Sequence, residues 1–568
     1  MSRALRVAGL LALAAVALGA CARIPTSGPV QQGAGGQVAG PNPAVVLAVG
    51  PQPGSQPEQI VEDYLTAGAA GVSNGLDFTV ARKYLYGDAA ANWNPLGGVL
   101  VVDGFTPSQP SDTQVTIEAS VVAKVDADGV YSETARGAPE TVTFGMVQDT
   151  SGQWRIKDVP DGLILTSRQF QDQFRRVSLF FLTPDAQYLV PDPRWYPAVN
   201  LATSVVKGLL AGPAPLLRDA VRTAVPQGVV LTPEAVTVKD GQAEVDLGPP
   251  AVVQAADHDL LVAQIQETLV QQVAQVRTVV VQAGADGPQL QGTKQLMTIG
   301  QAQATPAVAE VIASDANGEH LAALGAPGAA PVPVAGVAPL TGLDARSPAR
   351  SENGVLRAFL RGPNELATVP TAGQAPQTLL QMPNLAAPSV DRFGWVWTAS
   401  GGTVVAVNGH DPDVSLTPKW LADRTVTAVR VSRDSTRIAV VSTAQDGSGV
   451  SIDVAGIARD ERGGPQQLSD QTQRVGAALT VAGSVVWYDD DQLAVLARGA
   501  GSATVWEVPL GGPSKALPDV AGGVSLAGWR TERTLLVATS DGRLLIFSGP
   551  TWTPVEGVSG VRDPSYPG

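Results

Sequence analysis

The chain has 568 residues, of which 61 are glycine and 44 are proline, and its formal net charge is −14. This length suggests about three to four domains, and the many glycines and prolines favour turns and short strands over long helices. The negative charge argues against nucleic acid as a partner and against electrostatic binding to an anionic membrane. One cysteine and three scattered histidines exclude an intramolecular disulfide and argue against a metal centre, so we expect no metal and no cofactor.

Residues 1–20 have the pattern of a secretory signal peptide. Two arginines precede an uncharged apolar run, 7–20, which is too short to span a membrane. The run ends in Leu-Gly-Ala-Cys, which resembles a bacterial lipobox. The resemblance implies cleavage between Ala20 and Cys21, with N-palmitoyl and S-diacylglycerol groups on Cys21. Several acyl chains would then anchor the protein to the extracytoplasmic side of the cell membrane. An ordinary secretory signal with a chance cysteine is the alternative.

A stalk is predicted between this anchor and the first folded domain. Residues 22–57 carry one charge, are rich in Gly, Pro and Gln, and show no apolar periodicity. Such a composition is typical of a flexible linker, so 21–57 is interpreted as the lipidated cysteine followed by a stalk. The alternative is a partly ordered covering strand at Val45-Val46-Leu47.

The segment 58–175 has predicted helices first and predicted strands afterwards, which is an α+β order. Helical spacing of apolar residues predicts a first helix through Ile60, Val61, Tyr64 and Leu65, and a second helix is predicted over Phe78–Tyr86. Strands are predicted over Gly98–Val102, Gln114–Ala127, Val130–Thr134, Glu140–Gln148 and Trp154–Val159. This order resembles a curved-sheet, NTF2-like domain, a fold that often has a cone-shaped pocket.

The segment 177–300 is predicted to follow the order ββαββαβ. Its strands are expected over Ser178–Leu182, Gln187–Pro191, Ala235–Lys239, Ala243–Leu247 and Thr278–Gln282. One helix ends at Gly212-Pro213, and a second carries Leu261, Ile265 and Leu269 at helical spacing. The order, with Leu209-Leu210-Ala211-Gly212-Pro213 and Val236-x-Val238-x-x-Gly241-x-Ala243-x-Val245, resembles the GerMN domain of bacterial envelope proteins. The resemblance implies a binding or scaffolding module without catalytic residues.

The segment 305–568 contains an internal repeat of about 43 residues. Each unit has a turn, a compact apolar strand, a Gly-rich turn and another strand. The turns are centred near Gly318, Gly354, Gly394, Thr436, Asp491 and Arg533. This period predicts an all-β propeller of about six blades, with five or seven as alternatives. The wide spacing between the fourth and fifth turns predicts an insertion around Ala458–Arg474.

Few residues in the chain suggest chemistry. The string Gly71-Val72-Ser73-Asn74-Gly75 fits a nucleophile elbow, but a predicted helix precedes it, so a helix end is favoured. Asp126-Ala127-Asp128-Gly129 and Asp315-Ala316-Asn317-Gly318 resemble the start of a calcium loop but lack its distal glutamate, which favours hairpin turns. His258 is interpreted as part of an exposed helix start.

Two further features could serve binding. Asp489-Asp490-Asp491 is interpreted as a solvated turn, with contact to a cation or a basic partner as the alternative. Seven of the ten tryptophans lie in the propeller segment: Trp395, Trp397, Trp420, Trp487, Trp506, Trp529 and Trp552. Core packing is the favoured interpretation, and stacking on a sugar or anchoring a protein partner is the alternative.

The whole arrangement resembles the actinobacterial lipoprotein LpqB family. Besides the lipobox and the GerMN pattern, the run Val190-Pro191-Asp192-Pro193-Arg194-Trp195-Tyr196-Pro197 carries the resemblance. The resemblance implies a non-enzymatic partner of the extracellular part of an MtrB-like sensor histidine kinase. It would modulate a two-component system and so cell-wall homeostasis, division and antibiotic response. The alternative is a lipoprotein that binds cell-wall glycan or a small ligand on the propeller face, which predicts several exposed tryptophans there.

Overall fold

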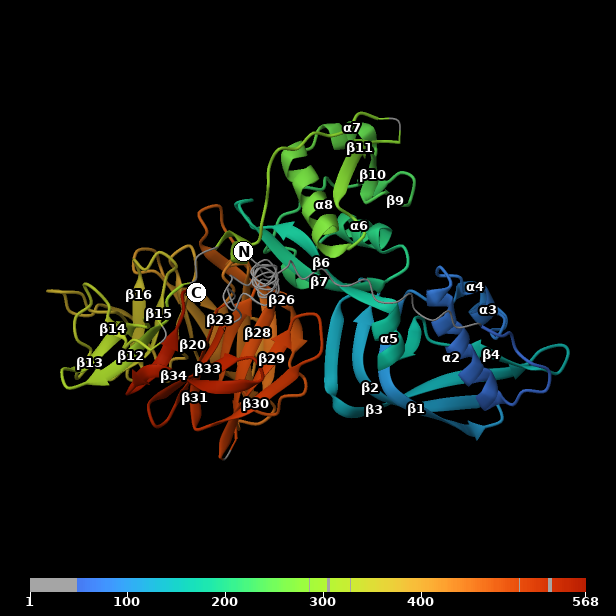
Figure 1. Cartoon of the computed structure of the whole chain (residues 1–568). Coiled ribbons are helices and arrows are strands. Elements are labelled where there is room, and N and C mark those ends of the chain that lie inside the picture. Colours follow the sequence, from blue (N-terminus) through green and yellow to red (C-terminus); the bar gives the residue numbers. More distant parts are fainter. Residues whose placement is uncertain (1–47, 286, 304–306, 327, 500, 530–533) are drawn as a thin grey trace, which may run out of the picture. The chain divides into compact units, whose positions relative to one another are not determined.

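The computed structural model describes residues 48–568, apart from residues 286, 304–306, 327, 500 and 530–533 (Figure 1). The predicted signal peptide, Cys21 and most of the predicted stalk therefore lie outside the described residues. Among the helices that are described, none has the length and apolar character needed to cross a membrane.

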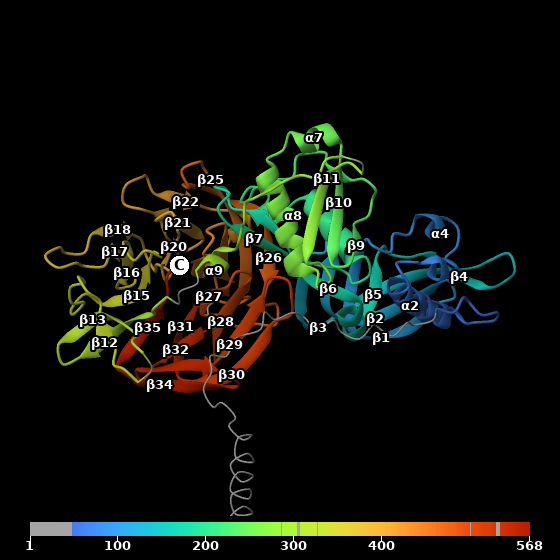
Figure 2. The same cartoon turned by 45° about the horizontal axis from the view of Figure 1, so that its top comes forward.

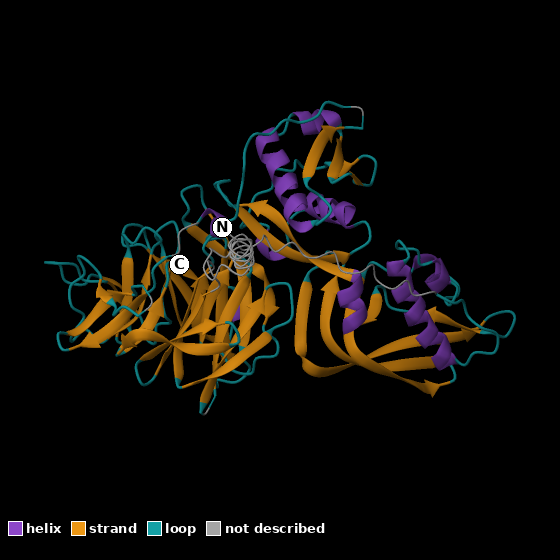
Figure 3. Ribbon diagram, viewed as in Figure 1, coloured by secondary structure: helices purple, strands orange, loops and turns teal. Residues whose placement is uncertain are grey.

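The N-terminal domain is built on a five-stranded sheet with the order β4-β3-β2-β1-β5. Its strands are β1 (Gly98–Ser111), β2 (Gln114–Asp126), β3 (Tyr131–Gln148), β4 (Trp154–Asp158) and β5 (Leu163–Thr166). Neighbouring strands are antiparallel except β5, which runs parallel to β1. The helices are α2 (Pro57–Ser73), α3 (Thr79–Arg82), α4 (Asp88–Asn92) and α5 (Ser167–Gln173). Helix α2 lies against the curved sheet and contacts β1, β4 and β5 (Figure 3).

The predicted α+β order of this domain is confirmed, with local corrections. The first helix buries Ile60, Val61, Tyr64 and Leu65, as its spacing predicted. The second is shorter than predicted and covers only Thr79–Arg82. The two strands predicted over 130–148 form one strand, because pairing with β2 continues through a β-bulge instead of stopping. Strand β5 and helix α5 were not predicted.

The last residues of the predicted stalk pack against the N-terminal domain. The Tyr84 hydroxyl donates to the Val49 carbonyl at 2.7 Å, and the Gly54 amide donates to Gln153 Oε1 at 2.7 Å. Ala48 packs against the core of the N-terminal domain. Residues 48–56 therefore belong to this domain, and the stalk prediction is wrong for them.

The second domain begins with a separate two-stranded ribbon, β6 (Phe174–Leu182) and β7 (Leu189–Pro197). A four-stranded sheet follows, in which β10 (Gln242–Gly248) pairs with β8 (Val230–Leu231), β9 (Thr237–Lys239) and β11 (Thr278–Ala283). The helical elements are α6 (Leu201–Ala211), η1 (Pro215–Leu217), α7 (Pro250–Gln254), α8 (His258–Gln272) and α9 (Ile299–Ala302).

The predicted ββαββαβ order is present in the second domain, with four short additions. Strand β8, helices α7 and α9 and the 3-10 helix η1 were not predicted. Helix α6 ends at Gly212 as expected, and the φ of 96° at this residue lies in the region that only glycine adopts without strain.

The third domain contains six four-stranded antiparallel sheets among its described residues (Figure 2). The first holds β12 (Glu310–Asp315), β13 (Gly318–Ala323), β14 (Val332–Pro333) and β35 (Val561–Ser565). The second and third hold β15 (Ala345–Arg350), β16 (Arg357–Arg361), β17 (Glu365–Thr368), β18 (Thr378–Gln381), β19 (Ser389–Val390), β20 (Val396–Ser400), β21 (Thr403–Val407) and β22 (Val414–Leu416), before η2 (Lys419–Leu421). The fourth holds β23 (Arg424–Val431), β24 (Arg437–Ala444), β25 (Ser451–Arg459) and β26 (Pro465–Val475).

The fifth and sixth sheets complete the domain. They hold β27 (Ser484–Asp489), β28 (Gln492–Arg498), β29 (Ser502–Pro509), β30 (Lys515–Ala521), β31 (Gly523–Trp529), β32 (Thr534–Thr539), β33 (Arg543–Ser548) and β34 (Thr551–Ser559). The last strand of the chain, β35, pairs with β12 and so joins the C-terminal end to the first sheet. Four-stranded sheets of this kind are the blades of a β-propeller, which is the architecture that the repeat predicted.

The repeat located the first hairpin of five sheets. Four of the six predicted turn centres fall between the first and second strands of successive sheets, at Gly354, Gly394, Thr436 and Asp491, and a fifth, Gly318, is the first residue of the second strand of its sheet. The sixth, Arg533, lies outside the described residues. The insertion predicted around Ala458–Arg474 is wrong, because these residues belong mainly to the long paired strands β25 and β26.

Candidate functional site

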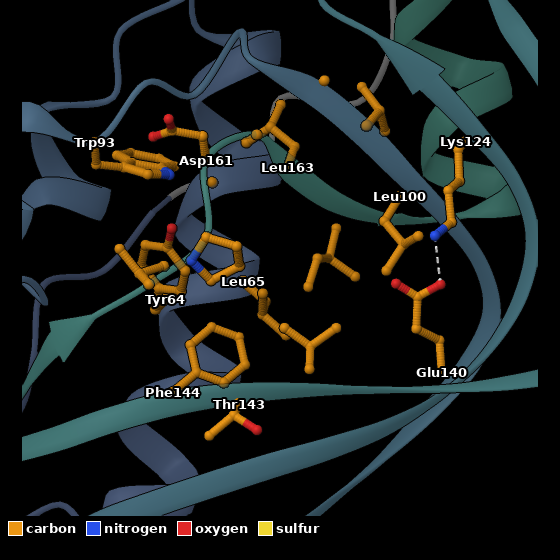
Figure 4. A pocket seen from close by; sticks show the side chains of 18 of the residues that line it. Tyr64, Leu65, Trp93, Leu100, Lys124, Glu140, Thr143, Phe144, Asp161 and Leu163 are labelled. Carbon is orange, nitrogen blue, oxygen red and sulfur yellow. Dashed lines mark ion pairs between the residues drawn. The ribbon is translucent and has the colours of Figure 1, made fainter.

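A cavity of about 570 Å³ lies in the N-terminal domain between helix α2 and the sheet. Side chains from α2 and from strands β1 to β5 line it, together with Trp93 and the loop 159–162 (Figure 4). The apolar part of the lining consists of Leu65, Val99, Leu100, Val125, Val142, Phe144, Val159, Pro160, Leu163 and Ile164. The volume falls within the range of about 300–1,000 Å³ that is usual for small-molecule sites.

One end of the cavity is aromatic. Tyr64 packs edge-on against Trp93, with ring centroids 5.4 Å apart, and against Phe144 at 6.3 Å. Trp93 is only 3% exposed, and its indole Nε1 has no hydrogen-bond partner among the described residues. Figure 4 shows this nitrogen on the side of the ring that faces the other lining residues. Burial raises the pKa of the Tyr64 phenol well above its usual value, so this end is a low-dielectric environment.

The rim of the cavity carries charges. Lys124 Nζ and Glu140 Oε2 form an ion pair at 2.7 Å, with the two side chains 52% and 40% exposed. Asp158, the last residue of β4, and Asp161, in the loop that follows it, also line the cavity. Asp161 Oδ1 accepts a hydrogen bond from the Asn94 amide at 2.8 Å. The lining residues thus include three carboxylates and one ammonium group.

The run 190–197, singled out in the sequence, is buried where the domains meet. Arg194 donates two hydrogen bonds to the Asp192 carboxylate, at 2.9 and 2.8 Å, and both side chains are about 4% exposed. Arg194 Nη1 also donates to the Asp128 carbonyl of the N-terminal domain at 2.7 Å. Trp195 Nε1 donates to the Gly511 carbonyl of the propeller at 2.8 Å. Strand β7 therefore contacts both neighbouring domains.

The acidic run 489–491 takes part in the same junction. Arg176 Nη2 donates to Asp491 Oδ2 at 2.6 Å, and the Asp491 side chain is 15% exposed. Arg437 Nη2 donates to the Asp490 carbonyl at 2.9 Å. The run does form a turn, but the Asp491 carboxylate is paired with Arg176 and not solvated as the favoured interpretation predicted. The alternative, contact with a cation or a basic partner, stays a prediction.

Glu133 on β3 makes a third link between domains. Its carboxylate accepts hydrogen bonds from the Ser514 amide at 2.9 Å, the Ser514 hydroxyl at 2.6 Å and the Ala477 amide at 3.1 Å. Gln473 Nε2 of the propeller donates to the Tyr131 carbonyl at 3.1 Å. The described residues of all three domains belong to one compact unit, and these contacts help to hold it together.

The propeller tryptophans are core residues. Trp395, Trp397, Trp487 and Trp529 are buried. The other three, Trp420, Trp506 and Trp552, are partly buried and pack against hydrophobic clusters. The exposed tryptophan face that a glycan-binding propeller was expected to present is therefore not seen, and the core-packing interpretation is confirmed.

The other motifs have structural roles. Ser73 is the last residue of α2, so the elbow-like string is a helix end. Asp126 and Asp315 accept hydrogen bonds from the amides two residues later, as hairpin turns do. Asp257 caps helix α8, which begins at His258. Within the described part of the chain, no group of three or more His, Cys, Asp or Glu residues could hold a metal ion. Cys21 and Ala20 lie outside it.

The cavity residue Trp93 and the junction residues Glu133 and Arg176 were not predicted. They come from elements distant in sequence from the residues they meet, so no local pattern identifies them. Two hints were available: the run 190–197 singled out in the sequence, and the three aspartates at 489–491 in a chain that is otherwise poor in charge.

The fold and the site define a modular propeller protein, with a cavity-bearing α+β domain and a second α+β domain before the propeller. Three family models match in the same order: the lipoprotein LpqB N-terminal domain over 50–171, a sporulation and spore germination (Germane) domain over 178–290, and the lipoprotein LpqB β-propeller domain over 319–567. The chain belongs to the lipoprotein LpqB family.

Individual relatives agree with this assignment. Lipoprotein LpqB of Mycobacterium bovis (strain BCG) is 29% identical over 509 residues, which is 86% of this chain and 80% of the relative. Lipoprotein LpqB of Cutibacterium acnes is 34% identical over 268 residues, 46% of this chain and 44% of the relative. Among solved structures, a regucalcin from Agrobacterium tumefaciens covers 38% of this chain and 74% of its own at 12% identity, but its TM-score of 0.29 supports no argument.

Proposed function

We propose that this lipoprotein is anchored through Cys21 on the extracytoplasmic side of the cell membrane and binds the extracellular part of an MtrB-like sensor histidine kinase. Binding would modulate the two-component system and thereby cell-wall homeostasis, division and antibiotic response. Membership of the lipoprotein LpqB family supports the lipid anchor. The lipobox-like end of the leader at 18–21 supports the site of attachment.

The observation that carries the proposal is the junction of the three domains. Glu133, Arg176 and Trp195 each contact a residue of another domain. Ion pairs and hydrogen bonds of this kind keep domains in a defined arrangement, so that a partner does not have to order them on binding. Such a preorganised body suits recognition of a large protein surface more than catalysis on a small substrate.

A bound lipoprotein changes kinase signalling only if it prefers one signalling state of the kinase. An equal affinity for both states shifts no population, however tight the binding. The proposed role therefore requires a difference in affinity between the two states. A tenfold difference corresponds to about 1.4 kcal/mol.

A direct titration tests the binding step. Residues 22–568, without the lipid, are titrated against the purified extracellular domain of the sensor kinase encoded in the same genome, and heat is measured by calorimetry. We expect saturable binding, and amide hydrogen exchange of the same complex then locates the protected strands. The extracellular domain of an unrelated sensor kinase is the control. The absence of binding at tens of micromolar would contradict the proposal.

A further inference from the structure

We propose that the cavity of the N-terminal domain binds an uncharged amphiphile, a molecule with an apolar chain and one neutral oxygen that accepts a hydrogen bond from Trp93 Nε1. This site is separate from the proposed kinase-binding role and does not depend on it.

The apolar lining indicates that the ligand has an apolar part. Ten aliphatic, proline or phenylalanine side chains surround a space of about 570 Å³, and they come from both the helix and the sheet. Burial of apolar surface is favourable in proportion to the area removed from water. A hydrocarbon chain or a ring system of moderate size therefore gains free energy by entering, whereas a polar sugar or peptide would lose its hydration without replacement.

The indole of Trp93 fixes the polar part. Buried hydrogen-bond donors in folded proteins nearly always have an acceptor, so a buried donor without one needs an explanation. Trp93 Nε1 lies at the aromatic end of the cavity, and no atom of the described residues accepts from it. A hydroxyl, ester or ketone oxygen of a ligand would satisfy this donor and give the ligand a defined orientation.

The charges explain why the ligand should be neutral. Glu140, Asp158 and Asp161 line the cavity together with one cation, Lys124, and that cation is already paired with Glu140 at 2.7 Å. A carboxylate or phosphate head group would meet more negative than positive charge. A cationic head group would be attracted to the carboxylates of the rim, but at the aromatic end it would be repelled by the Arg82 guanidinium, which lies 5.4 Å from the centre of the Trp93 ring.

The test compares three ligands that share a ten-carbon chain. Residues 22–568 are first loaded with the neutral fluorescent probe N-phenyl-1-naphthylamine, and its displacement by 1-decanol, decanoate and decyltrimethylammonium is measured. We expect decanol to displace the probe at the lowest concentration. An equal or higher affinity for either charged ligand would overturn the assignment of a neutral head group.

Two pairs of variants place the ligand in this cavity. Leu100 lines it and is partly exposed, so Leu100→Trp should fill the space and abolish decanol binding. Leu96 is 46% exposed and lines a second cavity of about 350 Å³ but not the first, so Leu96→Trp is the matched control. Retention of full decanol binding in Leu100→Trp, or its loss in Leu96→Trp, would refute the location.

The hydrogen bond is tested by the second pair. Trp93→Phe keeps an aromatic ring but removes the donor, and it should weaken decanol binding about fivefold while leaving the affinity for the fluorescent probe nearly unchanged. Trp154 is partly buried in the same domain and does not line the cavity, so Trp154→Phe is the control for a general change in packing. Equal loss for decanol and for the probe in Trp93→Phe would show a purely structural role and contradict the proposed contact.

Discussion

Replacement of Arg437 by methionine should strongly destabilise the propeller. Arg437 is 1% exposed and pairs with the Asp434 carboxylate, which is also buried. It also donates to the Pro191 carbonyl at 3.2 Å and lies over the Trp487 ring at 5.2 Å from its centre. Methionine preserves much of the apolar stem but leaves the Asp434 carboxylate without its cation.

The expected cost follows from these contacts. Removal of one partner of a buried ion pair costs about 3–5 kcal/mol. Asp434 keeps hydrogen bonds from Ser432 and Thr436, which places the cost near the lower limit, whereas lost hydrogen bonds to two carbonyls add about 1 kcal/mol each. We therefore expect the free energy of unfolding to fall by about 5 kcal/mol.

Urea unfolding of residues 22–568, followed by tryptophan fluorescence, measures this change, because seven of the ten tryptophans lie in the propeller. The double variant Arg437→Met with Asp434→Asn is the control, since it removes both charges. Its destabilisation should be smaller than the sum of the two single effects by about 2 kcal/mol. A single-variant loss under about 1 kcal/mol, or strict additivity, would refute the reasoning on this pair.

The remaining predictions concern pH, the junction and the anchor. Burial alone would raise the pKa of Asp434, but Arg437 and nearby hydrogen bonds hold that pKa below its usual value. The ionised Asp434 carboxylate therefore stabilises the fold above about pH 4, and this stabilisation is lost as the pH falls further. Thermal unfolding of Asp434→Asn should show a weaker acid dependence than that of the parent chain. Glu133→Ala should increase proteolytic cleavage between domains, whereas the exposed Glu118→Ala should not, and equal cleavage of the two would contradict the junction. Cys21→Ser should move the protein from the membrane fraction to the soluble fraction, and continued membrane retention would contradict lipidation there.

The sequence was sufficient to predict those features that follow from regular spacing of residues along the chain. The face of α2 was evident because Ile60, Val61 and Tyr64 are buried at helical spacing against the sheet. The repeat was evident because the first five propeller sheets begin with a short turn between two paired strands, and turn residues such as Gly318 and Gly394 adopt a positive φ. These features depend on neighbours within a few positions in the sequence.

Features that depend on distant residues were not predictable. Strand β5 has four residues and exists because it pairs in parallel with β1, about 60 positions earlier. The cavity depends on how Tyr64 of α2, Trp93 and Phe144 of β3 come together in space. The aspartate run was misread because its partner, Arg176, lies in another domain and shares no sequence pattern with it.

The most direct test of the central proposal is kinase activity in a membrane. The full-length sensor kinase is reconstituted in lipid vesicles, the lipidated chain is added to the side that carries the kinase's extracellular domain, and the rate of autophosphorylation is measured. The Cys21→Ser chain at equal concentration is the control. We predict a saturable change of rate that needs a lower concentration of the lipidated chain than of the control. An unchanged rate at concentrations that saturate binding would contradict the account.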